Sequence, residues 1–177
     1  PYTYYDHFKS KRLVAPEYGG DGKKLASNKY KDPVYGLPAH WAPNDLLFYS
    51  GDMFPERYKN GAFIAFHGST NRSPYPQAGY VVGFIPFKDG LPSGELEIFA
   101  DGFAQVEVIK EMKDAKYRPM GLAEGPDGSL YISDSKKGKI WRVVYTADKS
   151  SFTDENLKEM ELRKYLSHIK TPVEFQD

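Results

Sequence analysis

Two stretches of the chain, Phe63-Ile64-Ala65-Phe66-His67-Gly68-Ser69-Thr70-Asn71-Arg72 and Gly128-Ser129-Leu130-Tyr131-Ile132-Ser133-Asp134, share one layout. In each, a glycine-containing turn (Gly61 or Gly128) leads into an apolar run of strand length that ends in polar side chains. Aligning the two glycines places His67 opposite Asp134. Repeated strand units of this kind predict blades of a β-propeller, and the polar ends predict a site on one of its faces.

Around the first stretch, the apolar runs predict one complete blade. Turns at Lys59-Asn60-Gly61 and Lys88-Asp89-Gly90 separate the runs, and the last run alternates apolar and polar residues with a period of two. The predicted strands span residues 46–50, 62–66, 80–87 and 95–100. Four consecutive antiparallel strands of this length are typical of a propeller blade.

Around the second stretch, the pattern predicts an incomplete blade of three strands, at residues 120–124, 129–133 and 140–145. Residues 152–168 read as a helix where a fourth strand would follow. A three-stranded blade leaves an unpaired edge, which propellers normally close with a strand from the start of the chain. The start of this chain does not look like a strand.

The resulting organisation is an all-β partial propeller with a short C-terminal helix and tail. A loop-rich segment (1–45), a blade (46–100) and an incomplete blade (118–147) form the partial propeller of residues 1–147, and residues 148–177 form the helix and tail. Two blades cannot close a ring, because propellers need at least about four. We therefore expect the upstream half on another chain or another piece of this one.

Bulk composition narrows the class of protein. Of the 177 residues, 24 are basic and 24 acidic, and this balance argues against a nucleic-acid binder. The absence of cysteine excludes disulfides, thiolate metal sites and cysteine nucleophiles. No run of 18 apolar residues occurs, so no membrane span is predicted. The chain opens at Pro1 without a signal peptide or an initiator Met, which we interpret as a fragment or a processed piece.

Blade geometry predicts which polar residues meet. Strands alternate in direction within a blade, so the loop after a second strand lies on the same face as the segment that enters a first strand. The residues expected on this face near the axis are His40, His67, Asn71, Arg72, Arg118, Asp134, Lys136 and Lys137. Such mouths are common ligand sites.

The residue types on this face suit a polyanionic ligand. Arginine binds carboxylates through two parallel hydrogen bonds, and a histidine near neutral pKa can serve as a general base. Structural interpretations stay open beside the functional ones. His40 and His67 can be hydrogen-bonded structural groups, Arg118 can pair with a loop carboxylate, and Asn71 can cap a turn.

Four blocks of this sequence resemble a known family. The blocks that carry the resemblance are Ala39-His40-Trp41-Ala42-Pro43, Phe54-Pro55-Glu56-Arg57-Tyr58-Lys59-Asn60-Gly61, His67-Gly68-Ser69-Thr70-Asn71-Arg72, and the stretch from Arg118-Pro119-Met120-Gly121 to Ser133-Asp134. Over residues 1–147 they look like the C-terminal half of the glucose/sorbosone dehydrogenase family. That family consists of six-bladed propellers that use pyrroloquinoline quinone (PQQ) with calcium.

The resemblance implies a PQQ- and calcium-dependent oxidation of an aldose or an aldehyde in the periplasm or outside the cell. It implies that His67 acts in catalysis and that His40, Asn71, Arg72 and Arg118 lie around PQQ. The principal base and much of the calcium site would lie in the upstream half. No compact acidic cluster in this sequence offers the several oxygen ligands that calcium requires.

Two departures from the family pattern leave alternatives open. Thr70 stands where the family motif His-Gly-Ser-Trp-Asn-Arg has an aromatic residue. Some relatives continue into a cytochrome c domain, a candidate electron acceptor, but no Cys-x-x-Cys-His follows here. The alternatives are a non-catalytic propeller that serves as a binding or scaffold subunit, and a carbohydrate-binding propeller that uses exposed Tyr and Trp.

Overall fold

The computed structural model describes residues 2–6, 9–27, 31 and 33–166, and it divides into two units, Pro1–Gly36 and Leu37–Asp177. In the first unit, strands β1 (Thr3–Asp6) and β2 (Lys11–Val14) pair antiparallel, with Thr3 opposite Val14. A short 3-10 helix, η1 (Pro16–Tyr18), follows.

The prediction that the chain starts without a strand is therefore wrong. Tyr4 faces Leu13 across the hairpin, and Ser10 takes a positive φ of 48° just before β2 begins. Aromatic and β-branched residues favour a pleated strand once a partner strand covers them. The hydrophobic pattern of this segment was too short to reveal the pairing.

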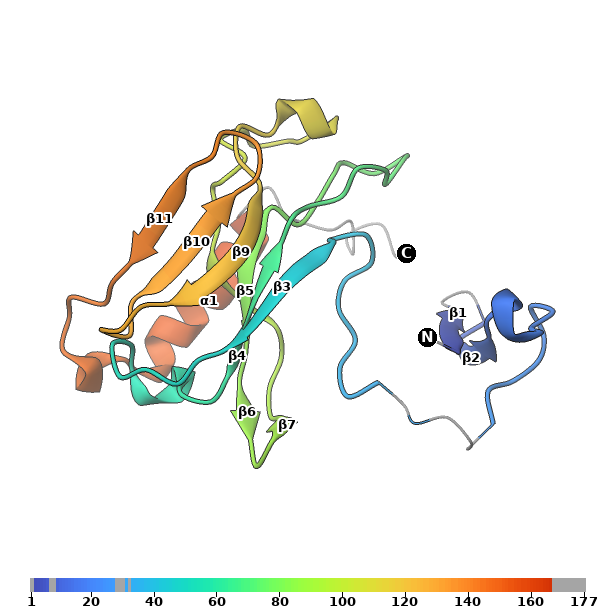
Figure 1. Ribbon diagram of the computed structural model, residues 1–177, viewed down its shortest axis with the longest axis horizontal. Helices are drawn as coiled ribbons and strands as arrows, with labels where there is room; N and C mark the ends of the chain where they lie inside the picture. The colour runs from blue at the N-terminus through green and yellow to red at the C-terminus, as the bar shows by residue number, and fades with distance from the viewer. Residues whose placement is uncertain (1, 7–8, 28–30, 32, 167–177) are drawn as a thin grey trace. The chain divides into compact units, whose positions relative to one another are not determined.

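A four-stranded antiparallel sheet forms the first half of the second unit (Figure 1). Its strands, in spatial order, are β3 (Pro43–Phe48), β4 (Ala62–Phe66), β5 (Val81–Ile85) and β8 (Glu97–Ala100). The four predicted strands are confirmed, although β3 begins at Pro43 rather than at residue 46. The 3-10 helix η2 (Glu56–Tyr58) lies between β3 and β4.

A small hairpin interrupts the connection from β5 to β8. It consists of β6 (Phe87–Lys88) and β7 (Leu91–Pro92), which pair across the predicted turn. Asp89 and Gly90 in this turn both take positive φ, at 53° and 79°. Two successive positive φ values define the tight turns that suit the twist of a β-hairpin.

The second sheet has three antiparallel strands in the order β11 (Ile140–Val143), β10 (Leu130–Asp134) and β9 (Pro119–Glu124). This confirms the three predicted strands, except that β11 ends at Val143 rather than at residue 145. The 3-10 helices η3 (Met112–Asp114) and η4 (Lys149–Ser151) flank the sheet in sequence.

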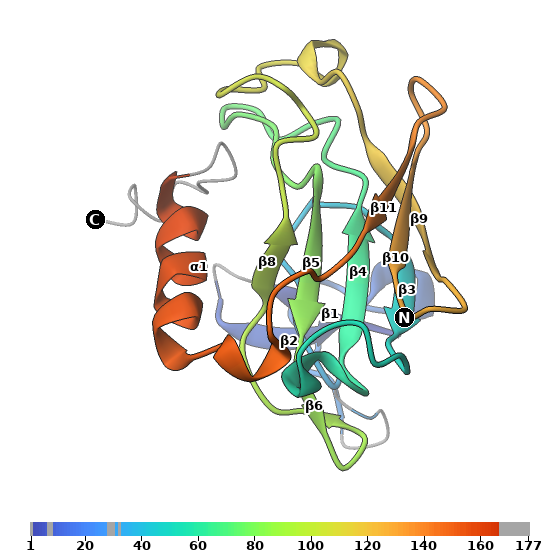
Figure 2. The same cartoon turned by 90° about the vertical axis from the view of Figure 1, so that its left-hand side faces the viewer.

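One α-helix, α1 (Asp154–Leu166), follows the second sheet and lies beside β8 (Figure 2). The predicted helix covered residues 152–168, and its last two positions lie outside the described residues. No helix in the described part of the chain is long and apolar enough to cross a membrane.

The main core lies between the two sheets and is rich in aromatic side chains. Phe63 from the first sheet and Leu130 and Ile132 from the second are almost completely buried in it. Several hydrogen bonds connect the sheets, and two of them lie near their first strands. The hydroxyl of Tyr49 donates to the carbonyl of Gly128 at 2.7 Å, and Asp45 Oδ2 accepts from the N–H of Leu122 at 2.7 Å. These contacts fix the first strands of the two sheets beside each other.

The described chain is thus an all-β protein with one α-helix, and its two larger sheets do not close on each other. The six-bladed propeller stays a prediction.

Candidate functional site

The polar ends of three strands meet at one side of the two sheets. His67 follows β4, Arg118 directly precedes β9, and Asp134 is the last residue of β10. Arg118 Nε donates to the carbonyl oxygen of His67 at 2.9 Å, and its backbone N–H donates to Asp134 Oδ1 at 2.6 Å. The structure therefore brings together three of the residues that blade geometry assigned to one face.

Arg118 anchors the backbone of the turn that carries His67. Its Nη2 donates to the carbonyl of Gly68 at 2.8 Å, and its guanidinium carbon lies 5.3 Å from the centre of the Tyr80 ring. The whole residue is only 7% exposed, and burial lowers the pKa of its guanidinium. Two guanidinium nitrogens of Arg118 donate to carbonyls of this chain. Arg118 therefore has fewer N–H donors left for a ligand than a free arginine has.

His67 is half-buried and shares a hydrogen bond of 2.7 Å between its Nε2 and the Oγ of Ser135. Burial, followed by the positive charge of Arg118, lowers the pKa of the imidazole, while Asp134 acts in the opposite direction. The neutral imidazole therefore dominates at pH 7 and can accept a proton. Sequence reasoning missed Ser135, because a serine beside Asp134 carries no recognisable signal.

Asp134 organises the turn between β10 and β11. Its Oδ2 accepts from the N–H of Lys137 at 2.5 Å, and its own N–H donates to the carbonyl of Lys139 at 2.8 Å. Burial favours the neutral acid, but hydrogen bonds from the backbone N–H groups of this turn and of Arg118 outweigh burial and lower the pKa of Asp134. Both carboxylate oxygens are thus used within the site.

The two lysines expected on this face differ in their roles. The ammonium of Lys136 donates to the carbonyls of Lys113, at 2.8 Å, and of Ala115. Lys136 therefore ties the β10–β11 turn to the segment around η3. Lys137 contributes its backbone N–H to Asp134, and its side chain is exposed.

A buried network supports the loop after His67. Ser69 Oγ donates to Gln77 Oε1 at 2.6 Å, and the hydroxyl of Tyr80 donates to the carbonyl of Ser69 at 2.6 Å. Gly68 takes a φ of 90°, and a Cβ atom there would lie 2.4 Å from the Tyr80 ring. Sequence reasoning missed Gln77 and Tyr80, although the polar pair Ser69 and Gln77 brackets the loop and could have indicated its closed stem.

Asn71 and Arg72 lie in the loop above this stem. Arg72 Nη1 donates to the carbonyl of Pro76 at 2.9 Å, and Asn71 is exposed. Burial lowers the pKa of Arg72. Among the hydrogen bonds of the described residues, none joins the side chain of Asn71 or Arg72 to His67 or Arg118.

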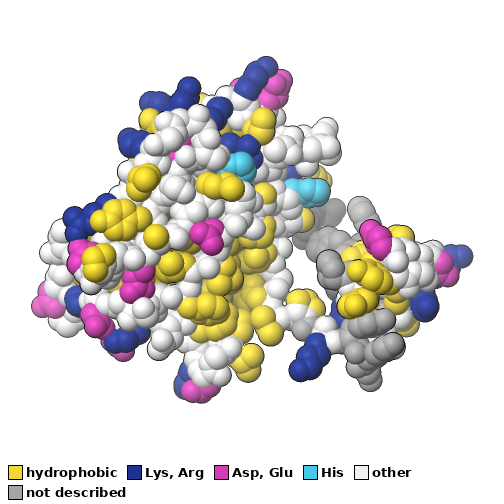
Figure 3. Space-filling view, in the orientation of Figure 1, with side chains coloured by type: hydrophobic (Ala, Val, Ile, Leu, Met, Phe, Trp, Pro, Cys, Tyr) yellow, Lys and Arg dark blue, Asp and Glu magenta, His cyan; other side chains and the backbone are white. Residues whose placement is uncertain are grey.

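His40 lies near the site because the backbone of the residues that follow it is hydrogen-bonded to the His67 turn. It is exposed and takes a positive φ of 64°. The carbonyls of Trp41 and Ala42 accept hydrogen bonds of 2.9 Å from Gly68 and His67, so the strand-entering segment lies against the His67 turn. Figure 3 shows both described histidines on one face of the molecule, with Lys and Arg side chains around one of them.

The described residues contain no group of three or more His, Asp and Glu side chains that could hold a metal ion.

The sequence model of the TrAA12-like family matches residues 9–146. An uncharacterized protein of Borreliella burgdorferi is 35% identical over 129 residues, which cover 72% of this chain and 32% of that protein.

Two solved structures of the Trichoderma reesei Carbohydrate-Active Enzymes Family AA12, an iodide and a calcium structure, resemble the chain with TM-scores of 0.56 and 0.51. Each is 22% identical to this chain, and the match covers 73% of this chain and 31% of the Trichoderma chain. The holo form of the pyranose dehydrogenase PQQ domain from Coprinopsis cinerea has a TM-score of 0.43 at 24% identity, and it covers 60% of this chain and 27% of that chain. The chain thus spans at most about a third of the length of these relatives.

Proposed function

Because this chain belongs to the TrAA12-like family, we propose that it is part of a PQQ-dependent oxidoreductase that acts on an aldose sugar or an aldehyde. The family match supports the wider class of PQQ-dependent dehydrogenase-like proteins. It does not single out the glucose/sorbosone dehydrogenases that the sequence motifs resemble. The carbohydrate-active Trichoderma relative supports a sugar as the substrate.

The observation that carries the proposal is the His67–Arg118–Asp134 cluster at the strand ends. Arg118 binds the backbone of the turn that carries His67, whose imidazole is neutral. Backbone N–H groups donate hydrogen bonds to both carboxylate oxygens of Asp134. Because backbone N–H groups already neutralise part of the charge of this carboxylate, the positive charge of Arg118 makes the surroundings favourable for an anion. This arrangement fits PQQ, which carries three carboxylates.

His40, Asn71, Arg72 and Arg118 are the proposed cofactor-binding residues, and His67 is the proposed catalytic residue. When bound, the quinone supplies the acceptor for two electrons from the substrate. His67 can hold the proton of a substrate hydroxyl, because its lowered pKa keeps the imidazole neutral. Arg118 keeps His67 in place through the two backbone carbonyls that it binds.

Calcium dependence belongs to the same proposal. The described residues do not fit a calcium site made of side-chain carboxylates, so such ligands would come from outside the described residues. The calcium structure of the Trichoderma relative is the finding that keeps calcium in the proposal.

The proposed architecture follows the sequence-based organisation. The sheets of residues 46–100 and 118–147 would be C-terminal blades of a six-bladed propeller, with the loop-rich segment 1–45 before them and a helix and tail at 148–177. The partner that completes the ring would be the upstream half of the same propeller. A periplasmic or secreted location and a cytochrome c as electron acceptor belong to the same proposal.

A non-catalytic propeller that serves as a binding or scaffold subunit is the alternative. Two observations favour it. Arg118 directs two guanidinium nitrogens to carbonyls of its own chain, and Thr70 is exposed where the resembling family has an aromatic residue. A sugar-binding propeller without PQQ is a second alternative.

Reconstitution tests the proposal. The protein, assembled with its remaining blades, is mixed with PQQ and calcium, and reduction of an artificial electron-acceptor dye is followed with a panel of aldoses and aldehydes. PQQ binding is measured separately by quenching of intrinsic fluorescence. Arg72→Ala should weaken binding, whereas Arg142→Ala, which removes an arginine paired with Asp127, serves as the control.

PQQ-dependent dye reduction would support the enzyme. The absence of PQQ binding to an assembly with all its blades would favour the scaffold subunit. Sugar binding that does not change when PQQ is removed would favour the sugar-binding propeller.

A further inference from the structure

His67 has a side-chain partner at one of its two ring nitrogens. Its Nε2 lies 2.7 Å from the Oγ of Ser135, and among the hydrogen bonds of the described residues none involves its Nδ1. A neutral imidazole carries one proton, so one ring nitrogen donates a hydrogen bond and the other accepts one. The contact with Ser135 therefore bears on which nitrogen of His67 is left to receive a proton.

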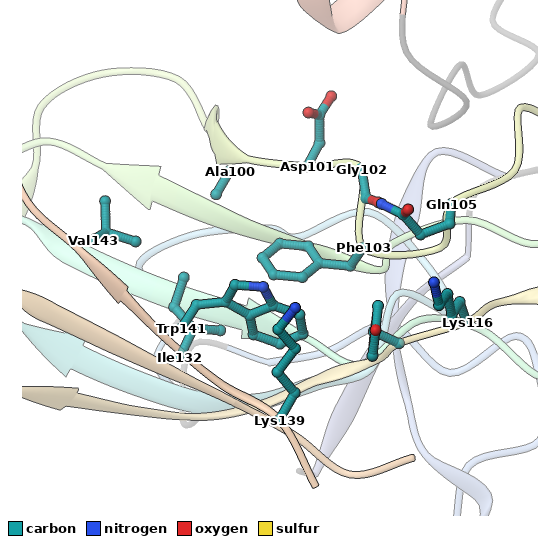
Figure 4. A pocket seen from close by; sticks show the side chains of 11 residues that line it. Ala100, Asp101, Gly102, Phe103, Gln105, Lys116, Ile132, Lys139, Trp141 and Val143 are labelled. Carbon is teal, nitrogen blue, oxygen red and sulfur yellow. The ribbon is translucent and has the colours of Figure 1, made fainter. Parts of the chain in front are cut away.

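Ser135 lies in a turn that several contacts hold in place. Its backbone N–H donates to the carbonyl of Arg118 at 3.2 Å, and across the turn the N–H of Asp134 donates to the carbonyl of Lys139 at 2.8 Å. The ammonium of Lys139 lies 5.4 Å from the centre of the Trp141 ring, and Figure 4 shows the two side chains next to each other. A side chain on a turn fixed in this way can orient its partner accurately.

Two charged groups act on the imidazole. Arg118 reaches the backbone carbonyl of His67 at 2.9 Å, and its positive charge adds to burial in lowering the pKa of the ring, whereas Asp134 acts in the opposite direction. Both carboxylate oxygens of Asp134 accept from backbone N–H groups. The group that meets Nε2 is instead the neutral hydroxyl of Ser135, which adds no negative charge that would raise the pKa of His67.

The direction of this hydrogen bond follows from what a proton acceptor requires. A hydroxyl can donate to Nε2 or accept from it. If Ser135 donated, its hydroxyl would have to turn away when the ring takes up a proton, since both nitrogens of an imidazolium are donors. If Ser135 accepts, the same hydrogen bond persists before and after proton uptake. The second arrangement suits a proton acceptor, because a preorganised site needs no rearrangement during the reaction.

We propose that Ser135 is a positioning residue: its Oγ accepts the Nε2–H of His67, keeps the ring in this tautomer and leaves Nδ1 as the atom that receives a proton. The inference rests on the proposed function for the source of that proton, which is the substrate hydroxyl. Proton uptake at Nδ1 gives an imidazolium whose Nε2–H still donates to Ser135. Ser135 itself gives up no proton in this step.

The tautomer can be measured without PQQ. In protein labelled with ¹⁵N-histidine, the two ring nitrogens give separate NMR signals that report which of them carries the proton. The signals of His67 are those that disappear in His67→Gln. Above the folded pKa of His67, we expect the unsubstituted protein to show the Nε2–H form almost alone. Ser135→Ala should move the ratio toward the mixture of both forms that free histidine shows.

Three further variants separate the hydroxyl from a general change of shape. Ser135→Thr keeps a hydroxyl and should keep the Nε2–H form, whereas Ser93→Ala removes an exposed serine elsewhere and should change nothing. Ser135→Asp keeps an acceptor and adds a negative charge, so it should retain the Nε2–H form and raise the pKa of His67. Circular dichroism checks that each variant stays folded.

A kinetic measurement addresses the reaction itself. In the protein assembled with its remaining blades, PQQ and calcium, we expect Ser135→Ala to lower the kcat of dye reduction by about 10- to 100-fold, as for partners that orient metal-binding histidines. KM should change little, because Ser135 acts on the proton acceptor and not on substrate binding. Ser135→Thr should restore most of kcat.

Three results would overturn the proposal. The first is the Nδ1–H form in the unsubstituted protein, which would make Ser135 the donor. The second is a tautomer ratio that stays unchanged in folded Ser135→Ala, and the third is an unchanged kcat of this variant in an assembly that reduces the dye. An assembly with all its blades that reduces no dye would count against the proposed function, while the NMR result would still decide whether Ser135 sets the tautomer.

Discussion

Arg118 holds the backbone of His67 from 51 positions further along the chain: its Nε donates to the His67 carbonyl at 2.9 Å. The same guanidinium reaches the next carbonyl, that of Gly68, at 2.8 Å. The two residues therefore form one structural unit. Arg118 positions the turn that carries the candidate proton acceptor, and any role in binding an anion comes in addition.

Removing this arginine should destabilise the protein. Arg118→Ala leaves the buried Gly68 carbonyl and the partly buried His67 carbonyl without this donor, and each such loss costs about 1–3 kcal/mol. We expect a clear decrease in the free energy of unfolding in urea. Arg142→Ala is the control, because Arg142 pairs with Asp127 at the surface and such pairs contribute little. Equal effects of the two substitutions would show that Arg118 does not anchor the turn.

The ionisation of His67 offers a second test. Burial and the charge of Arg118 lower its pKa, so an NMR titration of the folded protein should give a midpoint below the ordinary value of 6.5. Arg118→Gln should raise this midpoint, because it removes the positive charge and keeps hydrogen-bond donors. A midpoint at or above 6.5 in the unsubstituted protein would contradict the lowered pKa of His67.

The same shift predicts how stability depends on pH. Between the folded and the unfolded pKa of His67, the unfolded state binds more protons than the folded state. The contribution of His67 to the free energy of unfolding is therefore fully present above about pH 6.5 and is lost as the pH falls through the lower folded pKa. Denaturation of the unsubstituted protein and of His67→Gln across this range should show the difference.

Gly68 is a third testable position. Gly68 and Gly138 both take positive φ, at 90° and 67°, but only at Gly68 would a Cβ atom meet a neighbour, the Tyr80 ring at 2.4 Å. Gly138→Ala should cost about 1–2 kcal/mol from the backbone conformation alone. Gly68→Ala should cost more, because the packing of Tyr80 must also shift. Thermal denaturation compares the two, and similar midpoints would indicate that the turn adapts freely.

Tyr49 tests the connection between the sheets. Its hydroxyl donates to Gly128 at 2.7 Å and accepts from the N–H of Met53 at 3.0 Å, and the side chain is buried. Tyr49→Phe leaves the Gly128 carbonyl without this donor and should lower the free energy of unfolding by about 1–3 kcal/mol. Tyr145→Phe, which loses a longer hydrogen bond of 3.4 Å at an exposed position, should change it much less. If Tyr145→Phe proved as damaging as Tyr49→Phe, the Tyr49–Gly128 hydrogen bond would not be what joins the sheets.

Sequence patterns predicted the seven strands of the two larger sheets because those signals are local. Residues 95–98 alternate with a period of two, and Asp89-Gly90 marks a hairpin turn whatever lies around it. The segment Thr3–Asp6 had no comparable signal, since its strand depends on pairing with Lys11–Val14. The ends of the strands were less predictable. Strand β3, for example, begins at Pro43 because its pairing with β4 extends that far.

The candidate site, too, could be predicted from the sequence only in part. Equivalent turns in a repeat predicted that His67, Arg118 and Asp134 come together, because antiparallel strands return to the same side. The pattern could not show that Arg118 donates to the His67 backbone or that Ser135 contacts the imidazole. Both contacts depend on how the two sheets pack.

The sequence by itself determined where the strands and turns lie, since alternating apolar residues and glycine turns act over a few positions. The tertiary structure decided the partners of His67 and the Tyr49–Gly128 connection. Each of these depends on residues far apart in the chain that meet only when one sheet packs against the other, and the hydrogen-bonding capacity of a side chain does not reveal which distant group will satisfy it.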